Sequence, residues 1–118
     1  PGGTFIFVEF HPVVWMLDND LQQITYRYFK DEPIIEITEG TYADRSAEIS
    51  NESISWNHGL AEVVSALLKQ KLHLNQFEEY DYSPFACFPD VVLEGPEIYR
   101  TAHLGNKIPM TYSLVMTK

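Results

Sequence analysis

His11 is the side chain in this sequence best suited to moving a proton, and it directly follows an apolar run at residues 4–10. An imidazole titrates near neutral pH, so His11 could act as a base toward an attacking nucleophile. In open α/β sheets, ligands bind beyond the carboxyl ends of strands, and Glu9 and His11 stand at such an end. Tyr82 follows a later strand at the same predicted rim. The alternative for His11 is a rim histidine that is hydrogen-bonded locally.

Two further candidate substrate contacts, Trp56 and His58, stand just before a predicted helix. Asn57, between them, is predicted to cap that helix rather than to bind a ligand, since an asparagine oxygen can accept the free N–H groups of a first turn. Trp56 can equally pack beneath the strands that precede it.

The remaining reactive side chains give weaker signals. The four histidines show no metal-ligand spacing, so no metal site is predicted. Cys87 is the only cysteine and stands between Phe85 and Phe88, which favours a buried, inert thiol over a nucleophile. The acidic pair Glu78-Glu79 is predicted to be a solvated strand end rather than an acid–base pair.

Composition restricts the classes of partner. The 118 residues carry 17 acidic and 8 basic side chains, a formal charge of −9 that repels phosphate backbones and anionic lipid. No apolar stretch approaches the roughly 20 residues that a membrane span requires. With 45% hydrophobic residues, the chain is expected to fold as about one domain and to reside in the cytoplasm, without nucleic-acid or membrane partners.

The elements that position these residues fall into two halves. Residues 4–10 are β-branched or aromatic and fit a strand buried on both faces, in the middle of a sheet. Residues 21–56 predict an antiparallel meander, with strands near 24–28, 34–38 and 53–56 and a less regular stretch at 42–45.

The second half begins with an amphipathic helix over about residues 58–71, where apolar residues recur at helical spacing. A strand follows at residues 72–80, and a strand–helix–strand order implies a parallel pair with a crossover connection. Residues 81–106 read mostly as loop with a short strand at 99–102. Residues 108–117 predict a closing strand.

Pro1-Gly2-Gly3 precedes an apolar strand, and a helix, a second strand, an irregular segment and a final strand follow. This order of elements resembles the C-terminal half of a class I S-adenosylmethionine-dependent methyltransferase. Four segments are similar to a bacterial small-molecule subgroup of that family: residues 8–15 (VEFHPVVW), 40–45 (GTYADR), 56–58 (WNH) and 80–84 (YDYSP). The resemblance covers essentially the whole chain, residues 1–118.

The resemblance implies an α/β fold, or α+β for the isolated piece: the C-terminal part of a Rossmann-like sheet with strands five, six and seven and one main helix. Strand seven would insert antiparallel between strands five and six. Residues 13–56 would form a β-rich insertion, a lid over a small-molecule acceptor or alternatively a dimer surface. Substrate contacts would come from the rim and lid residues Glu9, His11, Trp56, His58 and Tyr82.

The methyl donor, S-adenosylmethionine, binds the first half of the family's sheet through a glycine-rich turn, and no such turn occurs here. The cofactor would therefore belong to the full-length parent, and this chain is expected to be inactive alone. Removing strands one to four would bare an edge of residues 4–10, so a homo-oligomer covering that edge is expected. The rival interpretation is a noncatalytic binding or dimerisation module built from this unit alone.

Overall fold

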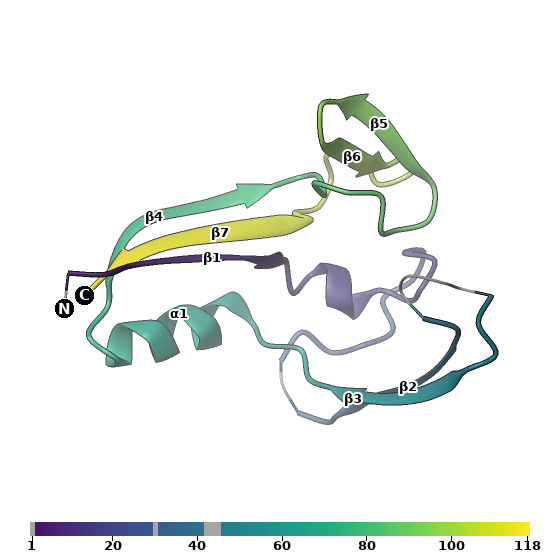
Figure 1. Cartoon of the computed structure of the whole chain (residues 1–118), viewed down its shortest axis with the longest axis horizontal. Coiled ribbons are helices and arrows are strands. Elements are labelled where there is room, and N and C mark those ends of the chain that lie inside the picture. Colours follow the sequence, from purple (N-terminus) through teal and green to yellow (C-terminus); the bar gives the residue numbers. More distant parts are fainter. Residues whose placement is uncertain (1, 30, 42–45) are drawn as a thin grey trace.

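A computed structural model of the chain describes residues 2–29, 31–41 and 46–118. Its centre is a three-stranded sheet of β1 (Thr4–Phe10), β7 (Thr111–Thr117) and β4 (His73–Tyr80), in the order β1-β7-β4 (Figure 1). β7 pairs antiparallel with both neighbours, so β1 and β4 run parallel to one another without touching. The prediction that the closing strand lies antiparallel between the other two is confirmed.

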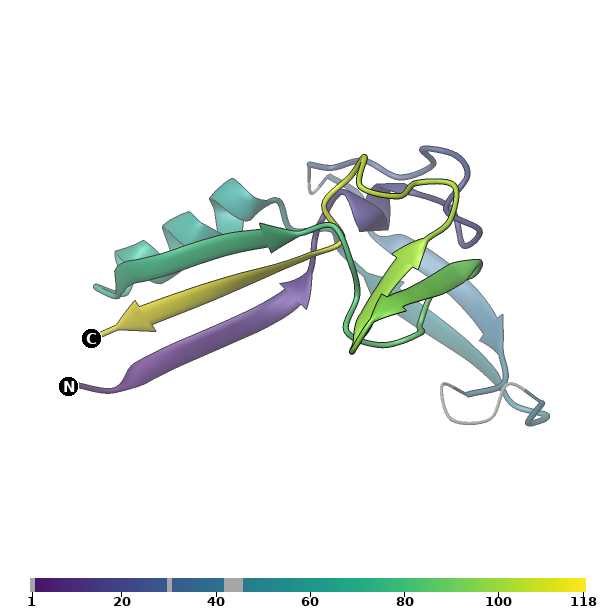
Figure 2. The ribbon, with the colours of Figure 1, turned by 90° about the horizontal axis from the view of Figure 1, so that it is seen from above.

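Helix α1 (Leu60–Lys69) covers one face of this sheet (Figure 2). Its apolar stripe packs against three side chains of β7 that are at most 2% exposed: Tyr112, Leu114 and Met116. The 3.6-residue period of the helix brings these side chains over alternate residues of the strand, and burying that surface is the main stabilising term for both elements. The predicted helix is therefore confirmed, within narrower bounds.

The start of α1 differs from the prediction. Gly59, not Asn57, is the N-cap, and it has no side chain with which to cap the helix. The Leu60 N–H instead donates to the Tyr28 hydroxyl at 3.1 Å, and a Cβ at Gly59 would lie 2.7 Å from Tyr28 Cε1. Glycine at this position therefore lets the Tyr28 ring lie directly against the helix terminus.

β1 is not buried on both faces, as the apolar run predicted. Ile6 and Val8 point away from α1 and are 68% and 61% exposed. A single crossover helix can cover only one face, and on the second face aromatic side chains contact Phe10 at the end of β1 but leave Ile6 and Val8 exposed. β1 pairs with β7 alone, which makes it an edge strand of the described sheet, as expected.

The predicted meander is a single hairpin, β2 (Ile34–Glu39) with β3 (Ser50–Ser55). Residues 24–28 form no strand; they contribute only an isolated bridge between Leu17 and Ile24, after the short 3-10 helix Val14–Met16. Tyr28 there packs against the helix start instead of alternating in a sheet. Predictions for residues 42–45 lie outside the described residues.

The stretch predicted as loop contains a second hairpin, β5 (Val91–Gly95) with β6 (Ile98–Thr101). Only the β6 part was predicted. Arg100 fastens this hairpin to the end of β4 because its guanidinium donates to Asp81 at 2.8 Å and also pairs with Glu94. Proline and glycine in this stretch mark the turns between strands rather than a continuous loop.

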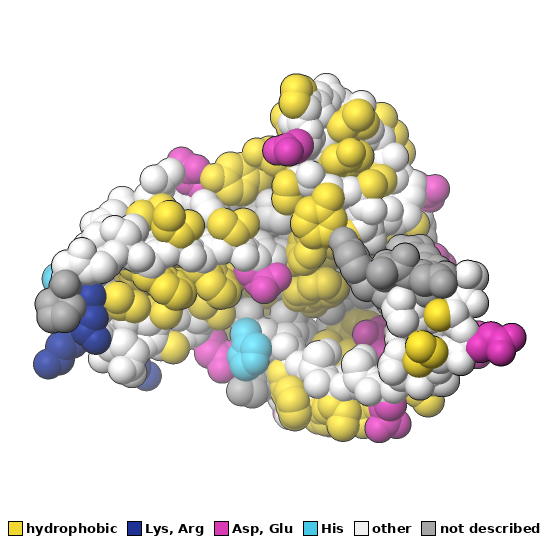
Figure 3. Space-filling view, viewed as in Figure 1, with side chains coloured by type: hydrophobic (Ala, Val, Ile, Leu, Met, Phe, Trp, Pro, Cys, Tyr) yellow, Lys and Arg dark blue, Asp and Glu magenta, His cyan; other side chains and the backbone are white. Residues whose placement is uncertain are grey.

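The two ends of the chain meet at one end of the sheet. The Gly2 N–H donates to the Lys118 carbonyl at 2.6 Å, and the Lys118 N–H donates to Gly3 at 3.3 Å. Both termini thus lie at the end remote from the two hairpins (Figures 1 and 2). Exposed Lys and Arg side chains gather at this end as well (Figure 3).

The described chain is a mixed α/β structure in which each hydrogen-bonded strand pair is antiparallel. A Rossmann-like parallel sheet is not seen among residues 2–29, 31–41 and 46–118. No helix in the described part of the chain is long and apolar enough to span a membrane.

Candidate functional site

A row of three polar side chains crosses the central sheet near the carboxyl ends of β1 and β4. Glu9 of β1 and Glu79 of β4 are each paired in register with Tyr112 of β7, which lies between them. Directly opposed residues share a face of a sheet, so this row lies on the same face as α1. Two carboxylates therefore flank one buried phenol at the predicted rim.

His11 lies beside this row and is 3% exposed. Its Nδ1 accepts the Val13 N–H at 3.1 Å, and its Nε2 lies 2.8 Å from Glu79 Oε1. Because Nδ1 is an acceptor, the neutral ring carries its proton on Nε2 and donates it to Glu79. The ring edge also contacts Tyr112, with ring centroids 6.0 Å apart.

Burial raises the pKa of Tyr112 to about 12, with a further contribution from the negative charge of Glu9. The phenol therefore remains protonated at neutral pH and can donate a hydrogen bond. Glu79, whose side chain is half exposed, forms the solvent end of a His11–Glu79 pair. The arrangement can hold a proton between an imidazole and a carboxylate.

The role of His11 as a base stays a prediction. Both ring nitrogens of His11 already take part in hydrogen bonds. To accept a substrate proton, Nδ1 would have to release the Val13 N–H, or Nε2 would have to pass its own proton to Glu79. The local hydrogen bonding that the alternative interpretation expected is the arrangement observed.

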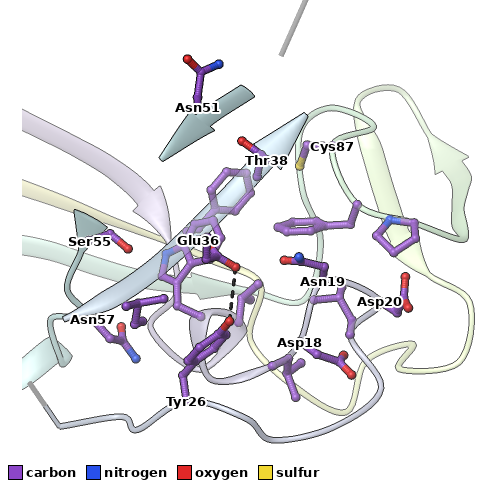
Figure 4. Close-up of a pocket in the computed structure, with 18 of the residues that line it drawn as sticks. Asp18, Asn19, Asp20, Tyr26, Glu36, Thr38, Asn51, Ser55, Asn57 and Cys87 are labelled. Atoms are coloured by element: carbon purple, nitrogen blue, oxygen red, sulfur yellow. Dashed lines mark hydrogen bonds between the residues drawn. The ribbon is translucent and has the colours of Figure 1, made fainter. Parts of the chain in front are cut away.

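A separate cleft of about 1100 Å³ opens beyond the end of β1. Its walls come from Phe10 and the segment that follows β1, from the β2/β3 hairpin, and from the loop carrying Cys87 (Figure 4). Neither Glu9, His11 nor Glu79 lines it. The rim row and the cleft are therefore two distinct candidate sites.

Aromatic side chains form one side of the cleft. The Phe10 ring meets Trp15, Phe85 and Phe88 edge-on, with ring centroids 5.1–5.9 Å apart. Trp56 and Tyr26 also line the cavity. Aromatic edges and faces of this kind provide apolar contact area of defined shape for a small ligand.

The β2/β3 hairpin presents its polar face to this cleft. Glu36 and Thr38 of β2 and Asn51 and Ser55 of β3 line it together with Ile34 and Glu39, whereas Ile35, Ile37 and Ile54 are exposed on the other side. The Tyr26 hydroxyl donates to Glu36 Oε1 at 3.3 Å across the cleft wall (Figure 4). Burial, together with the charge of Glu36, raises the pKa of Tyr26, so the phenol stays a donor at neutral pH.

The predicted site residues divide between these places. Glu9 and His11 belong to the rim row, and Trp56, 46% exposed, lines the cleft. His58 instead pairs with Glu62 on the surface of α1, at 3.2 Å. Tyr82 packs beneath Arg100, whose guanidinium carbon lies 5.9 Å from its ring centroid. The structure therefore does not bring His58 or Tyr82 to the cleft.

Asn57 has a structural role that the sequence did not reveal. It is 4% exposed, and its Nδ2 donates to the carbonyls of Pro12 and Arg27 at 3.0 and 3.3 Å. It thereby joins the end of β1 to the insertion that forms the cleft. Its Oδ1 is buried without a partner among the described residues.

Sequence reasoning set Glu79 aside as part of a solvated strand end, and it missed Glu36 and Tyr26. Glu79 could have been found from the register of the sheet, since it faces Tyr112 across β4 and β7. Glu36 stands among isoleucines in a strand, and that lone inward charge was a usable signal. Tyr26 carries no such signal, because the strand predicted for it does not form.

Cys87 borders the cleft, and burial raises the pKa of its thiol, with Ser83 Oγ 3.4 Å from the sulfur. That shift disfavours the thiolate, in line with an inert thiol. Within the described ranges, no three His, Cys, Asp or Glu side chains group as metal ligands.

No family model, no curated protein and no solved structure matches this chain.

Proposed function

We propose that this chain is the acceptor-binding, C-terminal half of an S-adenosylmethionine-dependent methyltransferase that acts on a small molecule. The observation that carries the proposal is the strand order, in which β7 lies antiparallel between β1 and β4 with α1 as the crossover. This is the order that the sequence resemblance implies for strands five, seven and six. The proposal keeps the expected cytoplasmic location.

The position of the cleft supports this role. It lies beyond the carboxyl end of β1, where α/β sheets bind ligands, and residues of the insertion 13–56 form much of its wall. An insertion in this place can orient an acceptor and exclude water from it. Orientation and exclusion of water are two main ways in which a protein accelerates a group transfer.

The residues of this chain do not fit the methyl donor. Gly2 and Gly3 precede β1 instead of following a strand, and a Cβ at either would meet no atom within 4 Å. They therefore cradle nothing in this structure. In the proposal, the donor's site belongs to a further part of the protein that carries the glycine-rich turn.

Calorimetry with S-adenosylmethionine tests the proposal in two arms. The protein encoded by the longer reading frame should bind the donor, and the 118-residue chain should show no binding heat. An upstream frame without a glycine-rich strand–turn–helix segment, or a longer protein that fails to bind the donor, would refute the proposal.

A noncatalytic association module is the second candidate, favoured by the apolar surface left uncovered. Ile6 and Val8 on β1 are exposed, and so are Ile35 and Ile37 on the outer side of β2, at 58% and 70%. The open edge of β1 adds unpaired backbone groups that another chain could match.

Both candidates predict a homo-oligomer through residues 4–10, and light scattering measures it. A Val8→Lys variant should lower the average mass, because a charge on an edge strand opposes strand addition. Wild-type protein that is monomeric at high concentration would remove the association module from consideration.

A further inference from the structure

The charged groups in the cleft all have one sign. Among the lining residues that the structure describes, every side chain charged at neutral pH is a carboxylate; these are Asp18, Asp20, Glu36 and Glu39. A concave wall of one charge focuses a field that attracts cations and repels anions. Phosphates and carboxylates are therefore poor ligands for this cleft.

The carboxylates are not arranged for a metal ion. Asp18 Oδ1 accepts the backbone N–H groups of Gln22 and Gln23, at 2.7 and 3.3 Å, and holds a local turn. Glu36 accepts the Tyr26 hydroxyl from the cleft wall. Hard divalent cations need several oxygens converging on one point, and these side chains serve separate partners.

The aromatic wall suits an organic cation. Phe10, Trp15 and Phe88 form one cluster, and Trp56 and Tyr26 line the cavity as well. Aromatic faces attract ammonium groups, most strongly when water is excluded, and they also pack against an apolar body. Carboxylates beside aromatic rings therefore favour a ligand with both parts.

Asn57 supplies an independent indication of a hydrogen-bond donor. Its Oδ1 is buried in a residue that lines the cleft, and it has no partner within the described structure. A buried acceptor left unpaired is destabilising, and buried polar groups are paired in most proteins. An N–H group is the kind of partner this oxygen lacks.

The orientation of the β2/β3 hairpin points the same way. Its cleft side carries Glu36, Thr38, Asn51 and Ser55 beside a single isoleucine, Ile34, while Ile35, Ile37 and Ile54 are exposed on the other side, the reverse of a hairpin that packs on an apolar core. A polar wall on one side of a cavity of about 1100 Å³ whose lining is otherwise largely apolar is suited to a ligand with a polar group and an apolar body rather than to core packing.

We propose that the cleft binds a primary or secondary amine, in its ammonium form, carried on an apolar or aromatic body. Glu36 accepts the ammonium N–H groups, and the cluster around Phe10 holds the body. The inference deepens the proposed function, on which it rests in taking this amine to be the methyl acceptor. For transfer, the bound ammonium would first lose a proton to Glu36 or to water, because only the neutral nitrogen has the lone pair that forms the new N–C bond as the donor's S–C bond breaks.

Tryptophan fluorescence tests the inference directly, because the only two tryptophans, Trp15 and Trp56, both line the cleft. The 118-residue chain is titrated with phenethylamine, with the neutral 2-phenylethanol and with the anionic 3-phenylpropanoate. The amine should bind about ten-fold more tightly than the alcohol, and the anion should bind more weakly than both. Equal affinities for amine and alcohol would overturn the inference.

A matched pair of variants locates the charge. Glu36→Gln should weaken phenethylamine binding about ten-fold and leave 2-phenylethanol unchanged. Glu52→Gln removes the same charge from the outer side of the same hairpin, and it should change neither affinity. Equal losses in both variants would show a general charge effect and no amine site. Each variant is compared with wild type in a denaturant unfolding curve.

The sulfonium of S-adenosylmethionine is also an organic cation, so it forms a further arm. Binding of the donor by this chain in a Glu36-dependent manner, without amine binding, would assign the cleft to the donor and refute the amine. Failure of the amine leaves the proposed function to be judged by donor binding to the longer protein, so the two failures are distinguishable.

Discussion

The covered face of the central sheet and the β2/β3 hairpin use the same strand alternation in opposite senses. On β7, the side chains that face the protein are Tyr112, Leu114 and Met116, nearly all apolar surface. On the hairpin, the inward side carries Glu36, Thr38 and Asn51 beside Ile34, and the outward side carries Ile35, Ile37 and Ile54. The alternation of apolar and polar residues thus marks two faces of a strand but does not say which one is covered.

The covered face of the sheet and the hairpin therefore contribute differently to stability and to binding. The face under α1 contributes stability, since its side chains lose nearly all contact with water. The hairpin contributes little apolar burial of its own and instead forms a cleft wall. Substitutions should therefore affect stability in one region and binding or association in the other.

The largest effect is expected in the core. Leu114→Ala should lower the free energy of unfolding by about 2–5 kcal/mol, because Leu114 is fully buried and a cavity would remain. Ile37→Ala, on the exposed side of β2, should change it by less than about 0.5 kcal/mol. Urea unfolding followed by circular dichroism measures both. Comparable losses would mean that the outer face of the hairpin is covered in solution.

Alkaline pH gives the next largest effect, through the buried phenol of β7. Because the pKa of Tyr112 is raised to about 12, the unfolded chain releases the phenolic proton at lower pH than the folded chain. The stability contributed by Tyr112 is complete below pH of about 10 and is lost as the pH rises toward 12, on the order of 2 kcal/mol. Tyr112→Phe should flatten this part of the stability–pH curve, and an unchanged slope would contradict the assignment.

A smaller effect is expected where the two regions join. Gly59→Ala places a Cβ too close to the Tyr28 ring and should cost about 1–2 kcal/mol through displacement of that ring. The cost should fall below about 0.5 kcal/mol in a Tyr28→Ala background, because the clash is then absent. Additive losses in the double variant would indicate that Gly59 matters for some other reason than the ring.

The smallest effect on stability is predicted on the outer face of the hairpin. A double variant, Ile35→Thr and Ile37→Thr, should unfold within about 0.5 kcal/mol of wild type, since threonine keeps the β-branch of an exposed strand residue. Light scattering should show less self-association. A large loss of stability would mean that the outer face of the β2/β3 hairpin is buried in solution. The hairpin and the face under α1 would then not differ in their contribution to stability.

Sequence patterns predicted the core well. Helical spacing of apolar residues located α1, and apolar runs located β1, β4 and β7, because these signals come from burial against a neighbour in the same chain. The antiparallel insertion of β7 followed from the resemblance and not from the residues. Burial of β1 on both faces was wrong, because periodicity does not report whether a second layer is present.

The candidate sites were predictable only in part. Glu9 and His11 stand at a strand end, where they were expected, and Trp56, predicted as a substrate contact, lines the cleft, while its contact with a substrate stays a prediction. The partnership of His11 with Glu79 joins residues 68 positions apart, so it depends on register. Asn57 was wrongly predicted to cap the helix. An asparagine just before a helix has the same sequence pattern whether it caps the helix or, as here, donates to the carbonyls of Pro12 and Arg27.

The meeting of the two termini has a practical consequence. Gly2 and Lys118 are hydrogen-bonded to one another, at the end of the sheet remote from the cleft. Adjacent ends can be joined and new ends opened elsewhere, so the chain is suited to circular permutation. New ends placed in the exposed Pro96-Glu97 turn would leave the cleft intact. An affinity tag or surface anchor at either end of the 118-residue chain would likewise hold the molecule with its cleft directed away from the support.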